Sequence, residues 1–210
     1  MSKISSINPS NIGWLSCALE PNEVDYVWKR IKEKEKSTDT LKHKLAGNIS
    51  TSKKLEDPDD WFYKNVLLKC CYAYNDLYEN MGNDLPLSNQ TLPYYLREWW
   101  VNYQYQNEFN PQHDHTGVYS FVIWLKIPTE YDEQNKDNIS NSKLKSVFQF
   151  TYTDILGKIR CYNYYLNKSF EGNMLFSPSK LNHQVYPFYN CDDSRISVSG
   201  NILVKLSQGG

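Results

Sequence analysis

The sequence predicts an α+β chain, mainly β, in which two N-terminal helices precede about seven short strands. In the first part of the chain, apolar residues recur three or four positions apart, which is helical spacing. From Leu92 onward, runs rich in Tyr, Trp, Val, Phe and Ile are broken by Gly, Pro, Asn and Asp, which is typical of strands joined by turns. The second half has no Gly-rich phosphate loop and no helix between strands, so a sandwich or barrel is favoured over a parallel Rossmann-type sheet.

Length and charge narrow the class of protein. The 210 residues suit one domain, with an N-terminal helical part over 1–91 and a β core over 92–205. With 23 basic and 24 acidic residues, the chain lacks the positive charge typical of nucleic-acid binding. It also lacks an apolar run of membrane-spanning length and the apolar core of a signal peptide, which predicts a cytoplasmic location. The five cysteines form no C-x-x-C pair and are expected to be reduced thiols.

The two helices are expected to begin at polar residues. Asn22 is predicted to cap a helix that ends near Lys36. After a polar connection over 37–52, the acidic turn that starts at Asp57 opens a second helix, which ends near Met81.

The strands of the second half are expected near 93–106, 118–127, 146–153, 158–166, 172–177, 184–188 and 194–205. Between two of these strands, residues 130–145 are polar and crowded with Asn, Asp, Lys and Ser. A loop of this length in a compact domain is often a lid, so we expect a mobile excursion here.

Three of the four histidines lie in strand segments bounded by turns. His113 and His115 are two positions apart, so in a strand both imidazoles point to one face while Asp114 points away. His183 begins a later strand, directly after a Pro-containing turn. Imidazole binds iron, zinc, copper and nickel, so these residues suggest a metal site without choosing the ion. The competing interpretation is that the histidines are surface residues or form ordinary hydrogen bonds.

Polar and apolar residues alternate in the last predicted strand. Its polar face carries Arg195, Ser197, Ser199 and Asn201, and the residues between them are apolar or glycine. If this face points into a barrel, Arg195 and Ser197 are able to hold a carboxylate through charge-assisted hydrogen bonds. If it points outward, the face is simply solvated.

These motifs together resemble those of a known superfamily. A strand-borne histidine motif, a distal histidine about seventy residues later and R-x-S about a dozen residues after that are similar to the pattern of Fe(II)/2-oxoglutarate-dependent dioxygenases. More narrowly, the segments HDHTGVYSFVIWLKIP, LFSPSKLNHQVYPF and RISVSGNI resemble oxygenases of this class carried by tailed phages of marine bacteria. The narrower resemblance covers residues 92–205, and the segment LAGN at 45–48 also occurs in that group.

The resemblance implies a double-stranded β-helix that holds Fe(II) at one end. It implies that 2-oxoglutarate chelates the iron while Arg195 and Ser197 bind its far carboxylate. Tyr103 matches a position where related prolyl hydroxylases carry a tyrosine of the cosubstrate pocket, although a core aromatic residue is an equally good interpretation. The implied reaction oxidises a C–H bond, usually to an alcohol, and releases succinate and CO2.

The candidate metal ligands depart from the superfamily pattern. The usual set is His-x-Asp/Glu with the distal histidine, whereas here His115 stands two residues after His113. Strand geometry favours His113, His115 and His183 as the ligands. Two other arrangements stay open. In one, a curled turn lets Asp114 supply a carboxylate beside one histidine; in the other, His115-Thr116-Gly117 acts as an H-x-G motif with a position for halide.

We therefore predict an Fe(II)- and 2-oxoglutarate-dependent oxygenase that hydroxylates a small molecule, a peptide or a protein. If the gene is carried by a phage, the expected location is the cytoplasm of the host cell. Two alternatives stay open: a jelly-roll binding module without turnover, and a cupin-type metal enzyme that does not use 2-oxoglutarate. No heptad or edge-strand pattern indicates an oligomeric state.

Overall fold

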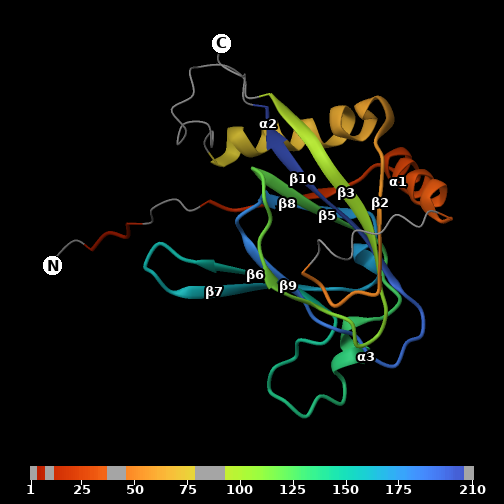
Figure 1. Ribbon diagram of the computed structural model, residues 1–210. Coiled ribbons are helices and arrows are strands. Elements are labelled where there is room, and N and C mark those ends of the chain that lie inside the picture. Colours follow the sequence, from red (N-terminus) through yellow and green to blue (C-terminus); the bar gives the residue numbers. More distant parts are fainter. Residues whose placement is uncertain (1–3, 8–11, 37–45, 79–92, 206–210) are drawn as a thin grey trace.

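The computed structural model describes residues 4–7, 12–36, 46–78 and 93–205 (Figure 1). Within these ranges, the strands are β1 (Leu15–Ala18), β2 (Thr51–Lys54), β3 (Tyr94–Gln104), β4 (Asn110–His113), β5 (Tyr119–Lys126), β6 (Val147–Thr153), β7 (Ile159–Tyr165), β8 (Asn173–Pro178), β9 (Asn182–Val185) and β10 (Arg195–Val204). The helices are α1 (Pro21–Lys34), α2 (Leu68–Tyr78) and α3 (Tyr131–Asn135), with single turns of 3-10 or π helix at Pro58–Asp60, Tyr63–Leu67 and Lys168–Phe170.

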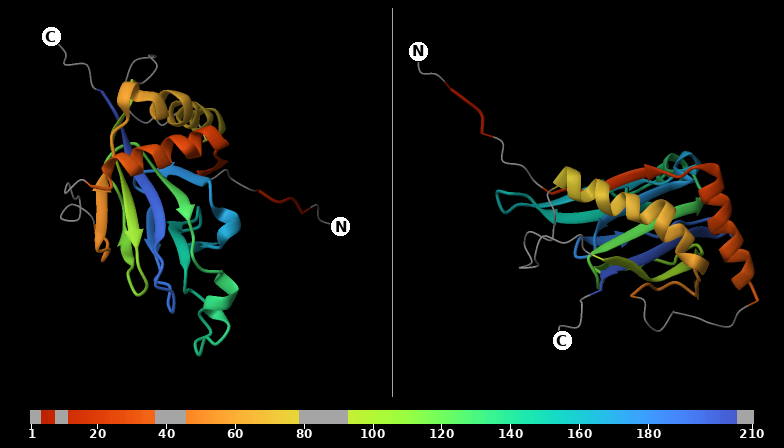
Figure 2. Two further views of the ribbon diagram at one scale, coloured as in Figure 1. Left: turned by 90° about the vertical axis from the view of Figure 1, so that its right-hand side faces the viewer. Right: turned by 90° about the horizontal axis from the view of Figure 1, so that it is seen from above.

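The strands form two antiparallel sheets. The major sheet has the order β1-β8-β5-β10-β3-β2, and the minor sheet has the order β4-β9-β6-β7. The minor sheet lies against one side of the major sheet, and α1 and α2 cover the other side (Figure 2). This is a double-stranded β-helix with helices added at the N-terminus, so the predicted fold class is confirmed.

Alternation along β10 separates the protein core from a pocket. Ile196 and Val198 point into the larger apolar cluster, which β10 shares with α1, α2 and the neighbouring strands. The inward-facing residues of the same strand are Arg195, Ser197 and Ser199. Because β10 pairs with β3 on one side and β5 on the other, it lies in the middle of the major sheet.

A smaller apolar cluster packs the two sheets together. Its buried members are Trp124, Ile127, Phe148, Phe150, Leu166 and Leu175. Several of them also line the pocket, so one side of the pocket is apolar and closely packed.

The first helix begins earlier than predicted. Pro21 occupies its first position, and Glu20, rather than Asn22, precedes it in an extended conformation. The Glu23 carboxylate accepts the Glu20 N–H at 2.9 Å, so the cap is formed by the third helical residue. A proline is favourable at this position because it has no N–H to leave unpaired.

The second helix begins with an irregular turn. Asp57 accepts the N–H groups of Phe62 and Tyr63 at 2.9 Å each, which confirms its role at the helix start. Asp59 and Asp60 have positive φ angles of 59° and 54°, so regular helix does not include them. The predicted end near Met81 lies outside the described residues.

The sequence prediction missed β1, β2 and β4. None of the three carries a long alternating pattern, since each has four residues and β4 reads NPQH. As β1 and β2 are the edge strands of the major sheet, the segment 1–91 is not purely helical. The strand expected over 184–188 begins earlier, at Asn182, and ends at Val185.

The excursion over 130–145 is anchored rather than loose. It contains α3, and the buried Asn135 amide donates to the carbonyls of Tyr131 and Lys145 at 2.9 and 3.0 Å. None of its residues lines the pocket between the sheets. The expected lid over the site is therefore not observed.

Candidate metal centre and its pocket

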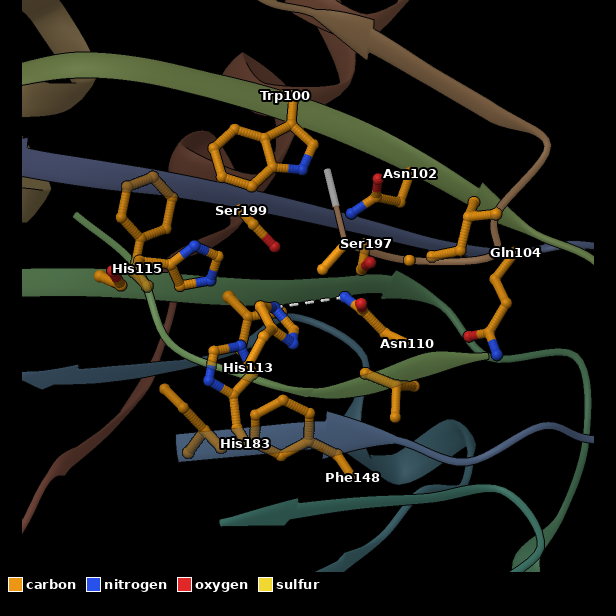
Figure 3. Close-up of a pocket in the computed structure, with 18 of the residues that line it drawn as sticks. Trp100, Asn102, Gln104, Asn110, His113, His115, Phe148, His183, Ser197 and Ser199 are labelled. Carbon is orange, nitrogen blue, oxygen red and sulfur yellow. Dashed lines mark hydrogen bonds between the residues drawn. The ribbon is translucent and has the colours of Figure 1, made fainter. Parts of the chain in front are cut away.

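A pocket lies between the two sheets, on the inner face of the major sheet (Figure 3). Its polar floor consists of side chains from β3 and β10, which pair as Trp100 with Ser199, Asn102 with Ser197 and Gln104 with Arg195. The opposite wall comes from the minor sheet and carries His113, Phe148 and His183. The site is thus built where the two sheets face each other.

Three histidines converge at one end of this pocket. His113 and His183 are paired across β4 and β9, and His115 follows just beyond the end of β4. The His115 N–H donates to the Ser179 carbonyl at 2.8 Å, which holds this residue against the turn after β8. One ring nitrogen from each of the three residues lies within 4.8 Å of the others. The grouping was predicted, but a turn, rather than a continuous strand, delivers His115.

Hydrogen bonds fix two of the three rings. His113 Nδ1 lies 2.7 Å from the Pro111 carbonyl oxygen, and His183 Nδ1 lies 3.1 Å from that of Leu181. A carbonyl oxygen only accepts, so both Nδ1 atoms carry the proton and both Nε2 atoms keep a lone pair, which at His113 lies 3.4 Å from the Asn110 amide nitrogen. Metal-bound histidines are commonly oriented by such a bond from the other ring nitrogen.

The histidines are held in their neutral form. Burial, together with the neighbouring imidazoles, lowers the pKa of His183 to about 3 and that of His115 to about 4. Burial also lowers the pKa of His113. Neutral imidazole is the form that binds a metal ion, so the cluster is ready to bind at neutral pH.

Asp114 is not part of the histidine cluster. Its carboxylate forms an exposed ion pair with Lys180 at 3.4 Å, although the residue lies at the edge of the pocket. Among the residues that the structure describes, the group of candidate ligands consists of His113, His115 and His183.

Arg195 is buried at the other end of the pocket with neutral partners. Its side chain donates to Gln104 Oε1 at 3.2 Å and to Ser146 Oγ, and its guanidinium lies 5.0 Å from the centroid of the Phe188 ring. Within the described part of the chain it forms no ion pair, and its Nε has no hydrogen-bond partner. Burial lowers the pKa of Arg195 to about 9, and no neighbouring charge offsets this. A buried guanidinium without a carboxylate partner favours an incoming anion.

The structure separates the two other predicted cosubstrate residues. Ser197 lies in the pocket, two residues from Arg195 on the same face of β10. Tyr103 lies on the opposite face of β3, where it packs against the larger apolar cluster. Strand alternation sends Asn102 and Gln104 into the pocket instead, so the structure corrects the placement of Tyr103.

Sequence reasoning missed several pocket residues. Asn102 and Gln104 alternate with Tyr103 in a strand that is rich in aromatic residues on both faces, so the pattern did not show which face points inward. Asn110 donates to His113 Nε2 at 3.4 Å, and its strand was not predicted. Ser146 ends a polar loop, and no sequence signal marked it.

Known proteins resemble this chain in sequence and in fold. Residues 98–201 match a family described as "Putative 2OG-Fe(II) oxygenase". A prolyl-4-hydroxylase from Pseudomonas putida aligns with TM-score 0.54 and 14% identity, over 92% of this chain and 93% of that chain. An oxidoreductase of the 2OG-Fe(II) oxygenase family from Burkholderia pseudomallei aligns with TM-score 0.52 and 12% identity, over 91% of this chain and 84% of that chain. No curated protein matches the sequence.

The fold and the site define a double-stranded β-helix oxidoreductase. The matched segment contains all three clustered histidines and Arg195, and the chain resembles the Fe(II)- and 2-oxoglutarate-dependent oxygenases in sequence and in fold. It is an enzyme whose cofactor is Fe(II) and whose cosubstrate is 2-oxoglutarate, as predicted. The family match favours this assignment over the binding module and the cupin-type enzyme. Among the helices of the described ranges, none is long and apolar enough to span a membrane.

Proposed function

We propose that His113, His115 and His183 hold the iron and that Arg195 and Ser197 bind the far carboxylate of 2-oxoglutarate. The observation that carries this proposal is the placement of both groups in one pocket, with neutral imidazoles at one end and an unpaired buried guanidinium at the other. The ligand nitrogens are close enough to meet at one ion after small ring rotations. In this proposal Asp114 stays outside the ligand set.

The residues of the pocket then have distinct tasks. The chemistry that iron and 2-oxoglutarate would supply here is the reduction of dioxygen, with one oxygen atom going to succinate as CO2 is lost and the other to the hydroxylated substrate. The histidines keep their neutral form, and the carbonyls of Pro111 and Leu181 orient two of their rings. Arg195 and Ser197 fix the cosubstrate at its far end. The apolar residues Trp124, Phe148 and Leu175 keep water away from one side of the pocket.

The reaction that we propose is the hydroxylation of a C–H bond in a small molecule or a peptide. The balanced charge of the chain supports neither a nucleic acid nor a strongly charged partner. The cytoplasmic location stays a prediction. The resemblance of the motifs to phage-borne oxygenases stays a prediction, and in that case the cytoplasm is that of the host.

An anaerobic titration tests the site. Fe(II) and then 2-oxoglutarate are added to the metal-free protein, and the expected result is the weak visible charge-transfer band of a chelated 2-oxo acid. We expect His183→Ala to lose iron binding and Arg195→Ala to lose the band at moderate cosubstrate concentration. Arg160→Ala is the matched control, because Arg160 forms an exposed ion pair with Asp154 in the β6–β7 hairpin.

Each other result contradicts the proposal. If iron binds but 2-oxoglutarate produces no band, the interpretation as a cupin-type metal enzyme replaces this proposal. If the wild-type protein binds no iron, the interpretation as a binding module without turnover replaces this proposal. If Arg195→Ala titrates like the wild type, the cosubstrate carboxylate is bound elsewhere.

A further inference from the structure

We propose that Gln104 and Ser146 are positioning residues that orient Arg195 through neutral hydrogen bonds and thereby keep its charge free for the cosubstrate. The inference rests on the proposed function, in which Arg195 binds the far carboxylate of 2-oxoglutarate. It adds the two residues that place the guanidinium, and a reason why neither of them is acidic.

Gln104 is held in one orientation. Its side chain is 3% exposed, and its Nε2 donates to the Glu108 carbonyl at 2.7 Å. That bond fixes the amide so that Oε1 faces Arg195, whose Nη1 donates to it at 3.2 Å. Glu108 is itself fixed, since its carboxylate accepts the N–H groups of Ser50 and Tyr105 at 2.9 and 2.8 Å. Through Gln104 and Glu108, the surroundings of Arg195 are therefore connected to Ser50, the residue directly before β2.

Ser146 is held in an unusual conformation. Its φ angle is +63°, in the left-handed region that a non-glycine residue rarely adopts, and its side chain is fully buried. The Ser146 N–H donates to the Pro187 carbonyl at 2.8 Å, and its hydroxyl accepts from Arg195 Nη2. Backbone strain of this kind persists where the surrounding structure enforces it, and it is frequent at functional sites. The turn places the hydroxyl against Arg195.

Gln104 and Ser146 are both uncharged. Neither of them neutralises the Arg195 guanidinium, which can therefore attract an anion strongly. A glutamate at position 104 has the same shape as glutamine and places a carboxylate where Oε1 lies. The guanidinium then forms an internal ion pair and has less to gain from a second carboxylate. With glutamine and serine, the orientation is kept and the full positive charge faces the pocket.

The substitution Gln104→Glu tests this idea with almost no change in volume. In the iron-loaded protein under anaerobic conditions, we expect the affinity for 2-oxoglutarate to fall about 30-fold, as for the loss of one charge-assisted hydrogen bond. The affinity for Fe(II) should change by less than about threefold, because residue 104 lies at the other end of the pocket from the histidines. The melting temperature of the metal-free protein should stay the same or rise, since the buried charge gains a partner. A general loss of structure predicts the opposite shift in melting temperature.

Gln149→Glu is the matched control. Gln149 is 5% exposed, but its amide contacts Asn163 and Gln184 in the minor sheet, not Arg195. This control should bind 2-oxoglutarate like the wild type.

A second variant covers the case in which Gln104→Glu does not fold. Ser146→Gly tolerates the positive φ angle and removes the small side chain with its hydroxyl, so we expect a stable protein with about fivefold weaker 2-oxoglutarate binding. Wild-type affinity in both variants overturns the inference. If the wild-type protein itself gives no 2-oxo acid band, the proposed function fails first, and this result is distinct from a band that persists unchanged in the variants.

Discussion

His113 and His183 face each other directly across the β4–β9 pair, with ring centroids 4.3 Å apart. The register of two short antiparallel strands therefore brings together residues that are 70 positions apart in the sequence. His115 joins them from the turn after β4, with its ring centroid 5.0 Å from each of the other two. The candidate ligand set depends on strand pairing and one turn, and not on a contiguous motif alone.

The identity of the ligands is tested by comparing His115→Gln with Asp114→Asn. If the three histidines bind the ion, His115→Gln should weaken Fe(II) binding at least about 100-fold, because a ligand is lost. Asp114→Asn should weaken it by less than about tenfold, since only a partly exposed nearby charge is removed. Anaerobic competition with a coloured chelator measures both affinities. A larger effect for Asp114→Asn would show that this carboxylate is a ligand.

Acid should destabilise the metal-free protein. The pKa values of His115 and His183 in the folded protein, about 4 and about 3, lie below the unfolded value of about 6.5, so protons bind preferentially to the unfolded chain. This contribution to stability is complete above about pH 7 and falls as the pH drops through 6.5 toward 3, by about 2 kcal/mol at pH 5 for His115 alone. Urea unfolding at pH 7.5 and pH 5 measures the difference. The double variant His115→Gln/His183→Gln should lose most of this dependence, and an unchanged dependence would assign it to other groups.

Removal of the buried charge at Arg195 should not unfold the protein. Arg195→Met keeps much of the side-chain length and removes a guanidinium that has only neutral partners. We expect the free energy of unfolding to change by less than about 1 kcal/mol, or to rise, because the cost of burying the charge disappears. Urea denaturation of the metal-free variant measures it. A loss of several kcal/mol would mean that the hydrogen bonds to Gln104 and Ser146 stabilise the fold more than the buried charge destabilises it.

Gly200 should not tolerate a side chain. A Cβ atom at this position would lie 2.6 Å from an atom of the Phe121 ring and 2.8 Å from the Trp99 Cβ. Gly200→Ala is therefore expected to destabilise the protein by about 1 to 3 kcal/mol through overpacking. Gly157→Ala is the control, since Gly157 has a φ of +82° but no neighbour within 4 Å of the added atom. Gly157→Ala should lower the free energy of unfolding by about 1 kcal/mol, through the backbone conformation alone. An equal loss in both variants would argue against overpacking at Gly200.

The sequence predicted the long strands and the faces of β10 well, because their patterns are local. Eight residues of β10, Arg195–Ile202, alternate between polar residues and apolar residues or glycine, and this alternation defines two faces by itself. The four-residue strands β1, β2 and β4 were missed, since their extended conformation depends on pairing with distant strands rather than on their own residues. A segment such as NPQH carries no local signal that it forms an edge strand.

The histidine cluster was predicted correctly as a group, whereas the surroundings of Arg195 were not. H-x-H spacing is a local signal, and the distal histidine follows a turn that contains proline. Gln104 and Ser146 reach Arg195 only through the register of β3 with β10 and the left-handed turn before β6. Tyr103 was misplaced for the same reason, because composition does not say which face of an aromatic strand turns inward.

The hydrogen bond from the His115 N–H to the Ser179 carbonyl connects the chain just after β4 to the turn after β8. β4 is a short edge strand with an interrupted register, so its own hydrogen bonds hold it weakly. An ion held by His113, His115 and His183 acts as a clamp, because it ties this edge to the turn that leaves the major sheet. Ion release then requires only local opening of one edge, so amide hydrogen exchange in β4 should slow on metal loading while exchange in β2 stays unchanged. We therefore expect the lifetime of the iron-loaded protein to depend on local opening of β4 rather than on global stability.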